Sequence, residues 1–119
     1  MSAKSRSLAA VDYLAHIEEA ASLAVGYIRG MSKNDFLKDK RTQQAIIYNI
    51  LIIGEAATKI INDYPEFVAT NKEMPWREMR GIRNRMAHGY YELDLDIIWD
   101  TVTGSLDKLS QQIKSIKNQ

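Results

Sequence analysis

The residues best suited to chemistry are Arg83, Asn84 and His88, which stand close together in the chain. An imidazole can accept or donate a proton near neutral pH. A guanidinium can offer two parallel hydrogen bonds to a phosphate whose negative charge grows during a reaction. Asn84 would position that phosphate or fix the histidine tautomer. The set suits transesterification of an RNA phosphodiester, in which the 2′-hydroxyl attacks the phosphorus.

This chemistry requires no metal ion, and the composition suggests none. The chain has two histidines, no cysteine and no tight cluster of carboxylates near His88. Zinc sites are built from cysteine and histidine, and magnesium or calcium sites from several carboxylates. We therefore expect neither a metal nor another cofactor.

The spacing of the three residues indicates where the site would form. On a helix, Asn84 and His88 share one face because they are four residues apart. Arg83 and His88 diverge by about 140° around the axis. Either the long Arg83 side chain bends round to His88, or a twofold axis brings His88 opposite Arg83 of a second copy. The second arrangement predicts a homodimer with its site at the interface.

A competing interpretation treats the same segment as an ordinary charged surface. Four arginines lie between Trp76 and His88 against one acid, Glu78. An acidic stretch follows, which could neutralise them across a pair of helices. Its members are Glu92, Asp94, Asp96 and Asp100.

The apolar periodicity predicts an all-α fold of four main antiparallel helices. The first helix runs from Ser7 to Arg29 and stops at Gly30, and the central helix runs from about Asp39 to Tyr64. The third runs from about Pro75 to His88 with Gly89 as its breaker, and the last follows Asp94 as a cap and continues almost to the C-terminus. Whether this antiparallel bundle is up-and-down or crossed stays open.

Two further features refine this prediction. Ser32 and Asp35 have the spacing of a capping box, so a possible extra short helix precedes the central one. In the central helix, Gly54, Ala56 and Ala57 form a small-residue patch that lets another backbone approach, and excess apolar surface favours self-association. Glu55 beside them would either orient an arginine such as Arg83 or reach solvent.

Length and composition limit the class of protein. The 119 residues fit one domain, residues 1–119, and the net charge of +1 gives no strong overall attraction to nucleic acid or membrane. The absence of cysteine, of a signal-peptide core and of an apolar run near eighteen residues predicts a cytoplasmic protein that does not enter a membrane.

The segment from Arg83 to Tyr90 matches the Arg-x(4 to 6)-His signature of the HEPN superfamily. Its His-x-Tyr ending resembles the HepT toxins, which pair with MntA-type minimal nucleotidyltransferases. The resemblance extends over nearly the whole chain and includes the helix segments Gly54–Ala57, Pro75–Arg77 and Asp94–Trp99.

The resemblance implies an all-α, HEPN-like homodimer that acts as an RNA endonuclease toxin. Arg83 and His88 would be catalytic, with Asn84 as their polar companion. The partner nucleotidyltransferase, an antitoxin, would transfer AMP from ATP to Tyr90 rather than Tyr91. Bulky, anionic phosphates beside the site would compete with the RNA backbone.

Two alternatives stay open at the level of sequence. The chain could be a catalytically inactive HEPN scaffold or binding subunit for a nucleotidyltransferase. It could also be a generic helical dimerisation module with a salt-bridged face. The presence of Arg83, Asn84 and His88 together favours the enzyme.

Overall fold

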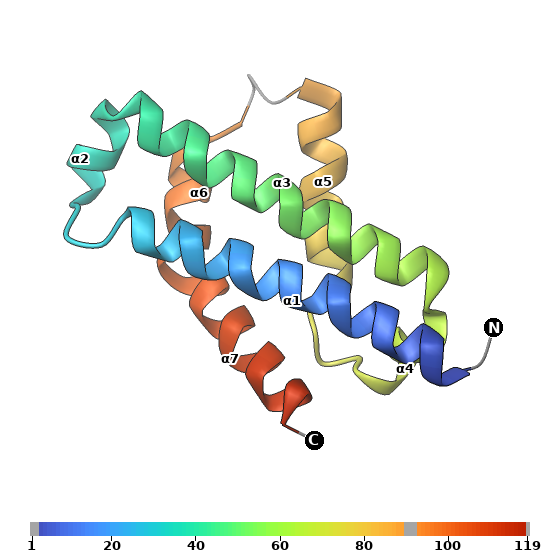
Figure 1. Ribbon diagram of the computed structural model, residues 1–119. Helices are drawn as coiled ribbons and strands as arrows, with labels where there is room; N and C mark the ends of the chain where they lie inside the picture. Colours follow the sequence, from blue (N-terminus) through green and yellow to red (C-terminus); the bar gives the residue numbers. More distant parts are fainter. Residues whose placement is uncertain (1–2, 90–92, 119) are drawn as a thin grey trace.

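The computed structural model describes residues 3–89 and 93–118, and every regular element within these ranges is helical (Figure 1). The all-α prediction is confirmed. The elements, in chain order, are α1 (Ala3–Tyr27), α2 (Lys33–Lys38), α3 (Lys40–Asp63), α4 (Pro65–Thr70), α5 (Trp76–Gly89), α6 (Leu95–Asp100), the π-helical turn η2 (Thr101–Ser105) and α7 (Leu106–Lys117).

The link between α1 and α3 follows its local sequence signals. Gly30, just beyond the end of α1, has a φ of 81°, a left-handed conformation that suits glycine. The hydroxyl of Ser32 accepts a hydrogen bond from the backbone N–H of Asp35 at 3.1 Å. The carboxylate of Asp35 accepts one from the N–H of Ser32 at 3.0 Å. This capping box confirms the predicted short helix, which is α2.

α3 begins where the sequence predicted, and a short helix that was not predicted follows its end. Asp39 caps α3, accepting hydrogen bonds from the N–H and hydroxyl of Thr42 at 3.1 and 2.8 Å, and these bonds lower the pKa of its carboxyl. α3 ends at Asp63, close to the predicted end at Tyr64, and Pro65 then begins α4, which was not predicted. A proline is tolerated there because first-turn N–H groups have no partner within the helix.

The helices form a crossed bundle. Figure 1 shows α1 and α3 side by side and antiparallel, with α5 crossing α3 and the last segment, from α6 to α7, passing across α1. This arrangement decides the question that the sequence left open. The fully buried side chains at the centre come from α1, α2, α3, α7 and the π-helical turn, and the largest are Leu14, Ile17, Phe36, Ile46, Ile50, Ile60, Val102 and Ile113.

The last predicted helix is interrupted. Asp94 caps α6 by accepting a hydrogen bond from the N–H of Asp96 at 2.8 Å, as expected. The chain then widens into the π-helical turn before α7. The buried residues Ile98, Val102 and Leu106 are separated by two four-residue steps, which would rotate the apolar stripe by about 80° in an α-helix. The wider turn keeps this stripe facing the core.

The central helix α3 is long and apolar enough, by length and composition, to cross a membrane, with a mean hydropathy of 1.3 over its best window. The sequence expectation that no stretch reaches this limit is therefore wrong. In the fold α3 packs between α1 and α5, and 44% of that window is buried. Contact with other helices on two sides accounts for much of its apolar character.

The closest approach between two helices occurs at Gly54. A Cβ atom placed on Gly54 would lie 2.5 Å from the Cβ of Arg83 and 3.0 Å from the carbonyl oxygen of Met79. Only glycine leaves room for α5 here. The small-residue patch thus serves a close backbone contact, as predicted, and the backbone that approaches belongs to α5 of the same chain.

Replacing Gly54 with alanine is expected to destabilise the protein by about 1–3 kcal/mol, because the added methyl group forces α5 away from α3. Urea unfolding of the variant measures this change. Gly26→Ala is the matched control, since Gly26 also lies in a helix but has no atom within 4 Å of the added Cβ. We expect the control to be neutral or slightly stabilised. Equal stabilities for the two variants would contradict the described contact.

Candidate active site on α5

α5 is an amphipathic helix whose buried face anchors it to α3. Trp76, Met79 and Met86 are buried. The indole Nε1 of Trp76 donates a hydrogen bond to the carbonyl oxygen of Asn71 at 2.9 Å, so this tryptophan is a packing residue and is not available to stack on a base. The opposite face of α5, which carries the charged residues, is left exposed.

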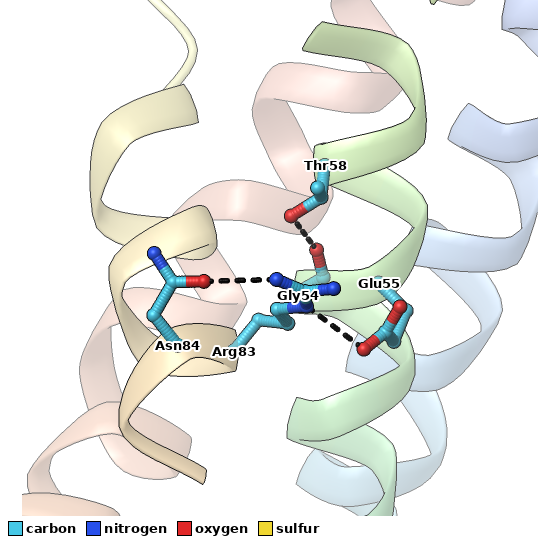
Figure 2. Close-up of polar contacts among 5 residues, drawn as sticks. All are labelled: Gly54, Glu55, Thr58, Arg83 and Asn84. Carbon is cyan, nitrogen blue, oxygen red and sulfur yellow. Dashed lines mark hydrogen bonds and ion pairs between the residues drawn. The ribbon is translucent and has the colours of Figure 1, made fainter. Parts of the chain in front are cut away.

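Arg83 is held on two sides at the contact between α5 and α3. Its Nε donates a hydrogen bond to Oε1 of Glu55, and its Nη1 donates one to Oδ1 of Asn84, both at 3.0 Å (Figure 2). Of the two roles expected for Glu55, the structure therefore shows orientation of Arg83. The other N–H groups of the guanidinium have no hydrogen-bond partner among the described residues. They are able to bind an anion.

This ion pair contributes little to stability, because the side chains of Arg83 and Glu55 are 36% and 55% exposed. Its effect is geometric. Gly54 lies next to Glu55 and brings the backbone of α5 close to α3, which sets the starting point of the Arg83 side chain. Thr58 donates a hydrogen bond to the carbonyl oxygen of Gly54 at 2.8 Å (Figure 2). Backbone packing and the carboxylate together determine where the guanidinium lies.

His88 lies in the last turn of α5 and is exposed, with Asn84 one turn before it on the same face. These two side chains line an open hollow of about 390 Å³ together with Arg85, Gly89 and Leu93. The hollow lies between the end of α5 and the segment that leads into α6. It is large enough for a phosphate group with its flanking sugar atoms.

The structure does not bring Arg83 and His88 together within one chain. α5 is continuous from Trp76 to Gly89, so the two side chains diverge by about 140°. The guanidinium of Arg83 is turned toward Glu55 on α3. Asn84 is the link, because it accepts a hydrogen bond from Arg83 and shares the face of His88. The expected modification site, Tyr90, lies outside the described residues.

Among the described residues of the acidic stretch, which leave out Glu92, none forms an ion pair with an arginine of α5. Asp96 forms an ion pair with Lys33 of α2 at 3.0 Å, which raises the pKa of that lysine, and Asp94 caps α6. Within residues 3–89 and 93–118, Arg83 is the one arginine of α5 in an ion pair. No group of three metal-binding side chains is found in these ranges.

The role of Glu55 can be measured directly through the Nε–H of Arg83. In Glu55→Ala the acceptor is lost, so this proton should exchange with solvent several-fold faster in ¹⁵N-resolved NMR spectra. Glu55→Gln keeps an acceptor oxygen and should retain part of the protection. Identical exchange in the wild type and Glu55→Ala would show that Glu55 does not hold the guanidinium.

Comparison with known proteins identifies the family of this chain. The family described as "Ribonuclease HepT-like" matches residues 17–116. The "Probable ribonuclease HepT" of Thermococcus cleftensis is 37% identical over 106 residues, which cover 89% of this chain and 94% of the relative. A "Putative RNase" of Caldanaerobacter subterraneus is 31% identical over 104 residues, covering 87% and 90%. No solved structure shows a significant match. The chain therefore belongs to the HepT-like family of HEPN ribonucleases.

Proposed function

We propose that this chain is a metal-independent endoribonuclease that acts in the cytoplasm as the toxin of a toxin–antitoxin module. The observation that carries the proposal is the arrangement of Arg83, held by Glu55 and Asn84 with further N–H donors open, on the same helix as an exposed His88. The names of the relatives, which describe ribonucleases, support it.

In the proposed reaction the 2′-oxygen of the RNA forms a bond to phosphorus and the bond from phosphorus to the 5′-oxygen breaks. One imidazole takes the proton of the 2′-hydroxyl, and a protonated imidazole gives a proton to the leaving 5′-oxygen. The guanidinium of Arg83 stabilises the negative charge on the phosphorane. The products are a 2′,3′-cyclic phosphate and a 5′-hydroxyl.

We propose further that two copies of the chain form the site. One chain alone leaves Arg83 and His88 on diverging sides of α5, whereas a twofold axis places each His88 opposite Arg83 of the other copy. Each such site pairs one Arg83 with one His88, whose imidazole can take the proton of the 2′-hydroxyl and then give it to the leaving 5′-oxygen.

An apolar edge of α3 next to the ion pair supports the dimer. Tyr48 is 63% exposed, and Leu51 and Ile52 are half-buried. Leu51 lies one helical turn before Glu55, on the same side of α3. A second copy that covers this edge would bury apolar surface and bring its own α5 toward Arg83. The same contact would then stabilise the dimer and complete the site.

Complementation between two inactive variants tests the shared site. Arg83→Ala and His88→Ala should each lower RNA cleavage by about 10²–10⁴-fold, because each removes one catalytic group. When both chains are refolded together, mixed dimers contain one intact site. The mixture should recover about a quarter of the wild-type activity if the chains pair at random.

Circular dichroism of the single variants serves as the control, since both residues are partly or fully exposed and neither change should unfold the chain. If mixed dimers form but stay inactive, the site lies within one chain. If the wild type itself cleaves no RNA and equals His88→Ala, the inactive scaffold becomes the better account.

We also propose that an antitoxin nucleotidyltransferase regulates the site through Tyr90. The phenolic oxygen would attack the α-phosphorus of ATP, pyrophosphate would leave, and the phenol proton would pass to a base. Tyr90 directly follows Gly89, where α5 ends, and stands two positions after His88. An AMP group there would bring negative charge next to Arg85 and His88 and would compete with RNA for the hollow.

Growth on induced expression tests this regulation. The wild type should arrest growth alone and be rescued by the partner nucleotidyltransferase. Tyr90→Phe should stay toxic with the partner present, because it lacks the acceptor oxygen. Tyr91→Phe is the matched control and should be rescued like the wild type. Rescue of Tyr90→Phe with no rescue of Tyr91→Phe would assign the acceptor to Tyr91 instead.

A further inference from the structure

The outer surface of α5 carries a line of polar residues that extends well beyond the proposed site. Arg77, Arg80, Asn84 and His88 are all exposed. At 100° per residue, these four side chains fall within a sector of about 80° around the helix axis. We call them the α5 ridge. Its C-terminal half belongs to the proposed site, whereas Arg77 and Arg80 have no role there.

The positive charge of Arg77 and Arg80 is not neutralised within the described part of the chain. Neither arginine forms an ion pair among residues 3–89 and 93–118. The one acid of α5, Glu78, points at least about 100° away from both. The chain as a whole has a net charge of only +1. Two cations in one line, neither of them in an ion pair with a described residue, are therefore a local feature of α5 and not a consequence of a basic composition.

The length of the ridge suits a strand of nucleic acid. With a rise of about 1.5 Å per residue, Arg80 lies about 12 Å and Arg77 about 17 Å from His88 along the axis. An extended strand spans such distances with on the order of two or three nucleotides. We propose that Arg80 and Arg77 bind the phosphates of a single-stranded RNA segment next to the bond that is cleaved. This inference rests on the proposed ribonuclease function and adds the form of its substrate.

Two observations favour a single strand over a duplex. Attack by the 2′-hydroxyl requires the 2′-oxygen, the phosphorus and the 5′-oxygen to lie in line, which the regular A-form helix does not provide. The ridge is also one straight row on one helix, whereas proteins that bind duplex RNA contact phosphates across successive grooves. Outside the proposed site the ridge consists of Arg77 and Arg80 and has no aromatic side chain, so its contacts there are to the backbone and carry little sequence preference.

The ridge is compatible with the proposed dimer. The twofold axis would pair the segment between Arg83 and His88 of one copy with the same segment of the other. Arg80 and Arg77 precede this segment by one to two helical turns. They would therefore lie outside the paired part of α5, where RNA leaving the site could reach them.

The test compares Arg77→Gln/Arg80→Gln with Arg29→Gln/Arg41→Gln, a control that removes the same charge from exposed positions outside the ridge. Binding is followed by fluorescence anisotropy with a single-stranded RNA of about 12 nucleotides whose 2′-oxygens are methylated, so that it cannot be cut. Cleavage of the unmethylated RNA and of a dinucleotide is measured in parallel.

The ridge variant should bind the methylated RNA about tenfold more weakly than the control, with a slope of log Kd against log salt reduced by about 1.4. Its kcat/KM should fall on the longer RNA, and this loss should disappear on the dinucleotide, which cannot reach the ridge. Affinity equal to the control would overturn the proposal. Equal wild-type affinity for duplex and single-stranded RNA would overturn the single-strand assignment.

Binding and cleavage separate this inference from the function on which it rests. Wild-type protein that binds the methylated RNA through the ridge but cuts no RNA would overturn the ribonuclease and leave a strand-binding surface. If the ridge variant and the control cleave RNA equally fast, the proposed ribonuclease function stands and the proposed role of the ridge is wrong.

Discussion

The contact of α5 with Gly54 determines the geometry of the candidate site. Because Gly54 has no side chain, the backbone of α5 approaches α3 closely enough for Arg83 to reach Glu55. The carboxylate then holds the guanidinium, and Asn84 binds its other edge. A larger residue at this position would move the whole helix and with it every polar group on the outer face of α5. Packing in the core thus controls a site on the surface.

The continuity of α5 keeps the two proposed catalytic groups, Arg83 and His88, apart. A single regular helix keeps Arg83 beside α3 and presents His88 about 140° away, at the hollow near the end of the helix. An enzyme that needs both groups at one phosphate must turn Arg83 away from Glu55, break the helix or use a second copy. The exposed apolar edge around Tyr48 is the reason for proposing the second copy.

Signals that depend on neighbours in the chain predicted the structure well. Ser32 and Asp94 cap α2 and α6 as predicted, and α3 begins next to Asp39, where the central helix was expected to start. A cap can be predicted because it is satisfied by N–H groups two or three residues away. The helix begun by Pro65 and the π-helical turn before Leu106 were missed. Pro65 stands just beyond the predicted end of the central helix, where a proline is common whether or not a new helix follows, and the turn shows itself only in the four-residue spacing of buried positions.

Contacts between residues that are far apart in the chain could not be predicted from the sequence. The sequence suggested that a backbone approaches Gly54 but did not say which helix provides it. It also left open whether Glu55 orients an arginine or reaches solvent. In the structure α5 crosses α3, so α5 is the helix next to Gly54 and Glu55 pairs with Arg83. The sequence also suggested that the acids after α5 neutralise its arginines, whereas Asp96 pairs with Lys33 because α2 lies next to α6.

Under the proposed function, His88 and Arg83 cleave RNA by attack of the 2′-hydroxyl without a metal ion. Incubating purified protein with RNA in excess EDTA, and identifying the ends of the fragments by mass spectrometry, tests this chemistry. We expect unimpaired cleavage that leaves 2′,3′-cyclic phosphate and 5′-hydroxyl ends. Cleavage abolished by EDTA, or fragments with 5′-phosphate and 3′-hydroxyl ends, would contradict it, because these ends require an attacking water or hydroxide.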